Sequence, residues 1–341
     1  MNSTVKKTTK WLGRSALLVV LVLISGYVVL STRYQAFKQQ PLAIAAEGQV
    51  FVVDPGMSGR AVINRLQDAG ITEWNWQWRW LMRQQPDPLK AGEYRLAAGF
   101  TAPQLLHILQ AGEVIHYRFT IVEGWTVSQL LLALQADELL GNGAEDMRGL
   151  TAIVQQLTKV ENPEGWFLPE TYQFVRGYSA SDLLQRAYQD MQVELQRAWE
   201  MRVTEHPLQT PYELLVLASI IERETAVDSE REDISGVFVR RLQKGMRLQT
   251  DPTVIYGLGS AYAGDIRKKD LQTDTPYNTY TRFGLPPTPI ALPGVAALQA
   301  AANPKAGSSL YFVADGQGGH TFSNTFEDHQ KAVNIMLGRK P

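Results

Sequence analysis

The stretch from Thr210 to Ile221 most restricts what this chain can fold into. Thr210 can cap the free backbone N–H groups of a helix start, Pro211 fits the first helical position, and Glu213 stands where a capping box places its carboxylate. From residue 214 to residue 221 the one polar side chain is a serine. A helix that is apolar on nearly every side is buried in a protein core. We therefore expect a domain built around this helix.

Glu222 follows the apolar run directly. On a helix, Leu215, Ala218 and Ser219 would share a face with Glu222. The carboxyl group would therefore lie at the end of a mostly apolar stripe. Desolvation at such a place raises a carboxyl pKa, as a general acid working near neutral pH requires. The alternative is structural, because a glutamate at a helix end is commonly exposed or paired with a cation, here Arg223 or Arg240. Glu224 adds nothing to the catalytic interpretation, since a residue two positions further along a helix points to another side.

The N-terminal segment constrains location. An apolar run from Ser15 to Thr32 follows four cations, which are Lys6, Lys7, Lys10 and Arg14. As a helix the run would span about 27 Å, close to the roughly 30 Å of a bilayer core. We predict a transmembrane helix over residues 15–32, with residues 1–14 as a cytoplasmic tail and the rest of the chain periplasmic or extracytoplasmic. A cleaved signal peptide is the alternative, but the small-x-small site at residues 43–45 comes too late after the run. The predicted location is thus the inner (plasma) membrane.

The chain after the span divides by pattern. Residues 33–48 are polar and then small, which predicts a tether. Between residues 49 and 150 short β-rich runs precede three turns of the form Gly-x-Ser/Thr, and each turn precedes an apolar helical pattern: the turns begin at Gly56, Gly99 and Gly124. Their uneven spacing argues against a solenoid and for a small α+β module. Glycines that include Gly141 and Gly143 predict a boundary, with a second domain over residues 151–341.

Four alternating tryptophans fall inside the first module: Trp74, Trp76, Trp78 and Trp80. Thr72 as a cap and Pro86 as a stop frame a helix there. On a helix, tryptophans at a spacing of two scatter over more than one face. Core packing is therefore favoured over a sugar-stacking platform, and both interpretations stay open.

The second domain mixes helices with a small sheet, so the fold class is α+β. Amphipathic patterns predict helices over residues 181–200, from Ser229 to Gly245, and from Asp251 onward. Residues 257–293 are rich in Gly, Pro, Asn and Thr, and a loop of this length is commonly a lid or a binding wall. Two neighbouring strands and a helix over residues 325–337 close the chain.

Composition excludes several classes of protein. A net charge of −1 argues against a nucleic-acid partner, and the absence of cysteine excludes disulfides, thiolate catalysis and Cys-ligated metals. The histidines form no HExxH pair, and the sequence has neither a GxSxG elbow nor a phosphate-binding P-loop. We expect no metal and no cofactor.

Several sequence blocks resemble the endolytic murein transglycosylases, the MltG or YceG-like family. They occur in the order of that family and cover the chain from about residue 49 to the C-terminus: EGWFLPETY (164–172), ASIIERE (218–224), GMRLQTDPTVIYG (245–257), YNTY (277–280), GLPPTPI (284–290) and LYFVADGQGGHTFS (310–323). Two positions depart from the pattern. Arg240 stands where the family has Asn, and Ala291-Leu292 stand where it has Asn before Pro-Gly.

The resemblance implies a membrane-anchored lytic transglycosylase that cleaves the MurNAc–GlcNAc bond within peptidoglycan strands and so terminates or trims nascent glycan chains. In this class the muramoyl 6-hydroxyl attacks its own anomeric carbon, which gives a 1,6-anhydro end without an enzyme nucleophile. Intramolecular attack leaves the protein to supply positioning and one acid–base group. We assign that role to Glu222. The module at 49–150 would be LysM-like, with a role in glycan binding or in structure, and peptidoglycan synthases would be further partners.

Six residues are candidates for substrate binding. Tyr277, Asn278 and Tyr280 offer flat apolar faces and hydrogen bonds that suit an amido sugar, and the others are Glu164, Gln249 and Asp251. The non-enzymatic alternative is a peptidoglycan-binding scaffold of the wall-synthesis machinery, with Glu222 held in an ion pair. Whether Glu222 faces a polar cleft or a closed core separates the two.

Overall fold

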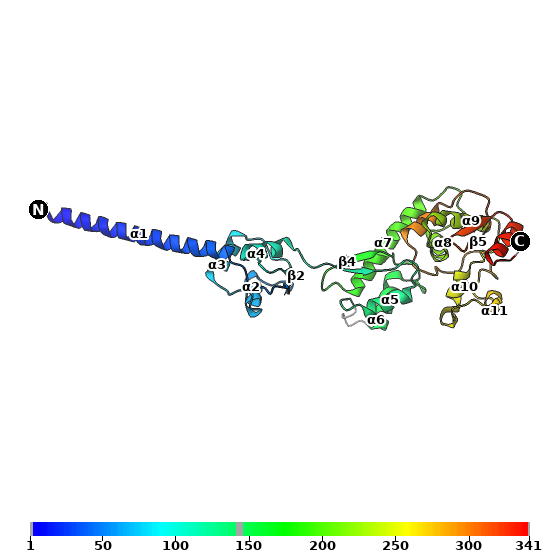
Figure 1. Ribbon diagram of the computed structural model, residues 1–341, viewed down its shortest axis with the longest axis horizontal. Coiled ribbons are helices and arrows are strands. Elements are labelled where there is room, and N and C mark those ends of the chain that lie inside the picture. Colours follow the sequence, from blue (N-terminus) through cyan, green and yellow to red (C-terminus); the bar gives the residue numbers. More distant parts are fainter. Residues whose placement is uncertain (1–2, 141–145, 340–341) are drawn as a thin grey trace. The chain divides into compact units, whose positions relative to one another are not determined.

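The computed structural model describes residues 3–140 and 146–339, with side chains from residue 15 onward. Within these ranges the chain forms two compact units, one ending at Tyr117 and one beginning at Arg118. Both contain helices and short strands, so the predicted α+β class is confirmed (Figure 1). The cations of the predicted tail, and Gly141 and Gly143 of the predicted boundary, lie outside the described side chains.

The N-terminal helix α1, Ser3–Gln39, runs unbroken through the predicted span and beyond it. Its part from Ser15 to Gln39 is long and apolar enough to cross a membrane, a test that a signal sequence near an N-terminus also passes. Tyr34 is buried in the first unit, and its hydroxyl donates to Gln84 Oε1 at 2.7 Å. This differs from the prediction of a tether over residues 33–48. The helix continues because Tyr34 and Phe37 gain a core to pack on.

The first unit packs helices on a two-stranded antiparallel sheet. Its strands pair in register from Gln49↔Leu96 to Val53↔Gly92, and Phe51 and Tyr94 point into the core. The elements after α1 are β1 (Gln49–Val53), α2 (Gly59–Asp68), α3 (Trp76–Gln84), β2 (Gly92–Leu96) and α4 (Ala102–Ala111).

The tryptophan-rich run forms α3, which Asn75 caps in place of the predicted Thr72. Trp78 is fully buried, whereas Trp76 and Trp80 are 43% and 48% exposed. Core packing therefore accounts for Trp78 and leaves two tryptophans on the surface.

The repeated strand–glycine–cap–helix pattern is present locally in all three copies, but the copies are divided between the units. Ser58, Thr101 and Thr126 are the N-caps of α2, α4 and α5 (Val127–Ala136). The third copy lies in the second unit, where α5 packs on α6 (Met147–Thr158), and β3 (Tyr117–Thr120) pairs with β4 (Thr171–Phe174). The division after Tyr117 therefore differs from the predicted boundary near residue 150, because the third copy finds its packing partners further along the chain.

The second unit is organised around α8, Pro211–Glu224, whose residues 214–221 are all buried. The predicted capping box is confirmed: the Glu213 N–H donates to Thr210 Oγ1 at 3.2 Å, and the Thr210 N–H donates to the Glu213 carboxylate at 3.3 Å. Three helices enclose α8, namely α7 (Ala180–Glu200), α9 (Arg231–Gln243) and α12 (Val295–Ala302).

The C-terminal part follows the predicted order of strand, strand and helix (Figure 1). β5 (Tyr311–Ala314) and β6 (His320–Ser323) pair antiparallel, and Thr325 caps α13 (Phe326–Met336). Between α9 and α12 the chain has little regular structure: two helices, α10 (Asp251–Leu258) and α11 (Lys268–Gln272), and the short 3₁₀ turn Gly259–Ala261. A similar turn, Asp228–Glu230, links α8 to α9.

Candidate functional site

The last turn of α8 presents two glutamates to different surroundings. Glu222 and Glu224 are two residues apart, so their side chains leave the helix on different sides. Both carboxyl groups are desolvated by burial, which raises the pKa of each. The neighbours that surround them decide which one a substrate can reach.

Glu224 lies in the wall of a pocket of about 450 Å³, which we call the Glu224 pocket. Glu224 is intermediate in exposure, as Glu222 is, and the Thr250 hydroxyl donates to its Oε1. Burial raises the pKa of Glu224 to about 7 against the opposing effect of that hydrogen bond, and the charge of Asp251 raises it further. A carboxyl group with this pKa is largely protonated below neutral pH and can give up its proton near pH 7.

Three of the predicted substrate-binding residues line the same pocket: Gln249, Asp251 and Tyr280. The Tyr280 hydroxyl donates to Asp251 Oδ1 at 2.6 Å. Gln249 holds a left-handed backbone with φ of 52°, which is uncommon for a residue other than glycine and recurs at functional sites. This bend leads the chain from the end of α9 into the start of α10, where Asp251 lies.

The C-terminal strands and α13 contribute further lining residues, which were not predicted from the sequence. Tyr311, His320 and His329 line the pocket, and the Arg241 guanidinium lies over the Tyr311 ring at 5.0 Å. His320 is held by Glu230, whose carboxylate accepts from its backbone N–H at 2.8 Å and contacts Nδ1 at 2.7 Å. The sequence block at residues 310–323 could have indicated this part of the pocket. It forms β5 and β6, whose pairing puts Ala314 opposite His320.

Glu222 lies in a polar group that we call the Arg231 cluster: the side chains of Glu222, Arg231 and Glu123 and the backbone N–H of Gly294. The Glu123 side chain is 48% exposed, so the cluster reaches the surface. The Gly294 N–H donates to Glu222 Oε2 at 2.9 Å, and Arg231 approaches Glu222 to 3.9 Å and Glu123 to 4.0 Å. The Glu222 side chain is 6% exposed. Burial is the main cause of its raised pKa, and the Gly294 hydrogen bond opposes the rise. The ion-pair partner is thus Arg231, while Arg240 donates to the carbonyl groups of Lys305 and Ser309.

The remaining three predicted binding residues lie elsewhere in the second unit. Asn278 is buried, and its amide donates to the carbonyl groups of Asp270, Leu271 and Thr273. Its Oδ1 accepts from the Tyr280 N–H at 2.9 Å, so Asn278 braces the loop. A role for Asn278 in sugar binding stays a prediction.

Glu164 and Tyr277 belong to another polar group. The Glu164 carboxylate accepts from the Val127 N–H at 2.8 Å and from the Tyr256 hydroxyl at 3.3 Å, and burial raises its pKa to about 7. Tyr277 lines a separate open hollow of about 780 Å³, where its hydroxyl bonds to Thr288 at 2.8 Å. In the described ranges, no group of three or more His, Asp or Glu side chains has an arrangement that could hold a metal ion.

A desolvated carboxyl group that faces a pocket lined by a second carboxylate, a phenol and an amide is typical of enzymes that cleave glycosidic bonds by acid–base chemistry. The YceG-like family model matches residues 51–335, and the chain belongs to this family. The chain is 34% identical over 177 residues to the endolytic murein transglycosylase of Bacillus subtilis strain 168, a match that covers 52% of this chain and 49% of that protein.

Two further comparisons agree. The endolytic murein transglycosylase of Streptococcus pneumoniae strain D39 is 31% identical over 183 residues, which cover 52% of this chain and 33% of that protein. The chain therefore spans about half, or less, of the length of these relatives. The crystal structure of a YceG-like protein from Listeria monocytogenes superposes with a TM-score of 0.57 at 28% identity, over 84% of this chain and 99% of that one.

Proposed function

We propose that this protein is a membrane-anchored endolytic lytic transglycosylase that cleaves the MurNAc–GlcNAc bond within peptidoglycan strands and leaves 1,6-anhydro-MurNAc ends. The names of the relatives support the substrate. The observation that carries the chemistry is Glu224, a carboxyl group with a pKa of about 7 in a pocket lined by Asp251 and Tyr280.

Glu224 is the acid and then the base. Its proton passes to the glycosidic oxygen as the bond from that oxygen to the muramoyl anomeric carbon breaks. The muramoyl 6-hydroxyl oxygen then bonds to the same carbon, and its proton returns to Glu224. One residue thus serves both steps. Because the attack is intramolecular, the protein needs chiefly to hold the 6-hydroxyl and the anomeric carbon in position. Asp251, which carries a negative charge in the same pocket, favours the positive charge that develops at the anomeric carbon.

Glu222, the acid assigned from the sequence, is the second candidate for this role. Its carboxyl group also has a raised pKa. The Gly294 N–H and the Arg231 guanidinium already occupy its surroundings, however, and its side chain is 6% exposed. The proposal takes Glu224 as the proton donor because it lines the pocket that also holds Asp251 and Tyr280, and Glu222 stays the second candidate.

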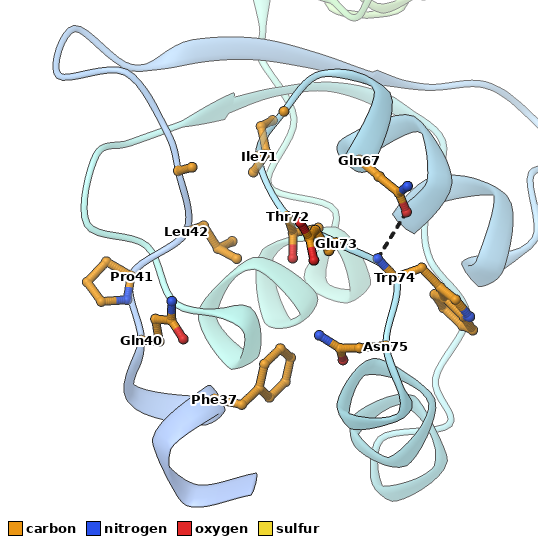
Figure 2. A pocket seen from close by; sticks show the side chains of 12 residues that line it. Phe37, Gln40, Pro41, Leu42, Gln67, Ile71, Thr72, Glu73, Trp74 and Asn75 are labelled. Atoms are coloured by element: carbon orange, nitrogen blue, oxygen red, sulfur yellow. Dashed lines mark hydrogen bonds between the residues drawn. The ribbon is translucent and has the colours of Figure 1, made fainter. Parts of the chain in front are cut away.

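The first unit is proposed to support glycan binding, as a LysM-like module would. It contains a hollow of about 740 Å³ bordered by an aromatic ring and by amides, among them Trp74, Gln40 and Asn75 (Figure 2). In the same view the Trp74 N–H donates to Gln67 Oε1 at 3.0 Å. The anchor is α1, with the two units on the periplasmic or extracytoplasmic side, and peptidoglycan synthases, which supply nascent strands, are proposed partners.

The experiment that tests the activity is mass analysis of muropeptides released when the purified full chain, in detergent, acts on intact glycan strands. We expect internal cleavage with 1,6-anhydro ends. Reducing ends in their place would indicate a hydrolase, and binding without cleavage would indicate a scaffold.

A further inference from the structure

The outer face of α3 carries two tryptophans and two arginines in a stripe. Trp76, Arg79, Trp80 and Arg83 follow helical spacing, so they share one face, and all four are exposed. Trp78 and Leu81 occupy the opposite face and are buried. We call the exposed four residues the Trp-Arg stripe. Large aromatic rings beside cations are the side chains that membrane proteins place at the level of the lipid headgroups.

The stripe lies beside the end of the apolar helix. The Trp76 and Tyr34 ring centroids are 6.2 Å apart, and the Tyr34 hydroxyl bonds to Gln84 at the other end of α3. Tyr34 of α1 thus contacts residues at both ends of α3. Since Tyr34 lies on α1 and is part of the core of the first unit, the C-terminal part of α1 packs into that unit.

The height of the stripe follows from helix geometry. The apolar run ends at Thr32, and Tyr34 comes two residues later on the same unbroken helix, a rise of about 3 Å. A side chain that touches Tyr34 therefore lies close to the edge of any bilayer core that α1 spans. Lys38, whose Nζ is 5.2 Å from the Tyr34 ring centroid, adds a cation on the following turn.

We propose that the Trp-Arg stripe docks on the phospholipid bilayer that α1 enters, with Trp76 and Trp80 among the headgroups and with Arg79 and Arg83 beside lipid phosphates. This inference rests on the proposed membrane anchor. The anchor alone would hold the first unit near the membrane, whereas the stripe sets which face of the unit meets the lipid.

The chain has no cysteine, so single cysteines can be labelled in the full protein with an environment-sensitive fluorophore. Arg83→Cys places the label on the stripe, and Tyr27→Cys places it within the apolar run. Arg95→Cys is the matched control, because Arg95 is exposed on the sheet between the buried residues Tyr94 and Leu96 and so points away from the core that holds Tyr34. Each protein is reconstituted in phosphatidylcholine–phosphatidylglycerol vesicles that contain nitroxide lipids, labelled at the headgroup or at mid-chain.

We expect headgroup nitroxides to quench the label at residue 83 at least threefold more than the label at residue 95, and mid-chain nitroxides to quench the label at residue 27. Adding Trp76→Ser and Trp80→Ser to the Arg83→Cys protein should remove most of the quenching at residue 83. If the label at 27 is quenched while that at 83 behaves like that at 95, the stripe does not touch lipid and the anchor stands. Protection of residue 83 from aqueous iodide without lipid quenching would assign the stripe to a protein partner or a second copy. An unquenched label at 27 would overturn the anchor and, with it, this proposal.

Discussion

Glu222 and Glu224 leave the same turn of the same helix, yet their surroundings differ in kind. Glu222 lies within the Arg231 cluster, where a guanidinium and a backbone N–H already stabilise its carboxylate. Glu224 has a threonine hydroxyl and a nearby carboxylate, and it faces a pocket of about 450 Å³. Desolvation raises both pKa values, so a raised pKa alone does not single out a catalytic acid. The proposal for Glu224 rests on its place in the wall of a pocket lined by polar groups.

The largest expected effect concerns stability in the Arg231 cluster. Arg231→Met should leave the buried Glu222 carboxylate without the guanidinium 3.9 Å away, and removing one partner of a buried pair costs roughly 3 kcal/mol of unfolding free energy. Urea unfolding of the full chain in detergent measures this. Arg282→Met is the control, because Arg282 pairs with Asp274 at the surface and should cost under about 1 kcal/mol. Equal losses in the two variants would show that the cluster is not a buried ion pair.

The pH dependence of cleavage tests the Glu224 pocket. Burial raises the pKa of Glu224 to about 7, so the acid is protonated below this pH and becomes ionised above it. The cleavage rate should therefore fall roughly tenfold per pH unit above 7, which amounts to about 100-fold at pH 9. The free energy of unfolding should also fall as pH rises. A carboxyl group with a raised native pKa binds its proton more tightly when folded, so the stability that it contributes is lost as pH rises from about 4.5 to 7. Glu224→Gln should flatten part of that fall, and an unchanged profile would contradict the raised pKa.

Gly294 offers a steric test of the Arg231 cluster. A Cβ at this position would lie 1.9 Å from Glu123 Oε1, so Gly294→Ala forces Glu123 or the start of α12 to move. We expect a loss of about 1 kcal/mol, at the low end of overpacking effects, because the half-exposed Glu123 side chain can move aside. Thermal unfolding of Gly294→Ala combined with Glu123→Ala checks the cause, since removing the Glu123 side chain should restore most of the loss. Additive losses would mean that the clash is with something else.

The smallest predicted effect concerns Tyr280 in the wall of the Glu224 pocket. Tyr280→Phe removes the 2.6 Å hydrogen bond to Asp251 and leaves the ring in place. The cleavage rate should fall by about fivefold, with the pH profile moved slightly upward, because a less stabilised Asp251 carboxylate disfavours ionisation of Glu224. Tyr262→Phe loses an exposed hydrogen bond to Gly264 and should change neither. If Tyr280→Phe also changes neither, Asp251 lies outside the reaction.

Local structure could be predicted where the signal lies within one element. The capping box at Thr210, the burial of α8 and the pairing of β5 with β6 all follow from periodicity and cap chemistry. The surroundings of Glu222 and Glu224 could not, because Thr250 and His320, which lie near Glu224, are distant from it in sequence. The bonds of the Asn278 amide to the backbone of its own loop were not predicted either, since they depend on how the loop folds.

The division after Tyr117 could not be predicted, although the repeated strand–glycine–cap–helix pattern is present in the structure. Thr126 caps α5 just as Thr101 caps α4, so the sequence predicts two related copies in one module. The pairing of β3 with β4 and the packing of α5 on α6 assign the later copy to the second unit. A pattern that repeats strand and helix does not state which core each copy joins.

The central claim is that Glu224 supplies the proton and Glu222 supports the fold. The most direct test measures the release of 1,6-anhydro muropeptides and the melting temperature on the same samples of Glu224→Gln and Glu222→Gln. The account predicts that Glu224→Gln loses the roughly 10²- to 10⁴-fold typical of acid–base catalysis while its melting temperature holds or rises. Glu222→Gln should keep cleavage within about tenfold and melt at a lower temperature, because Arg231 loses a buried partner. Retained cleavage in Glu224→Gln together with lost cleavage in Glu222→Gln would contradict it.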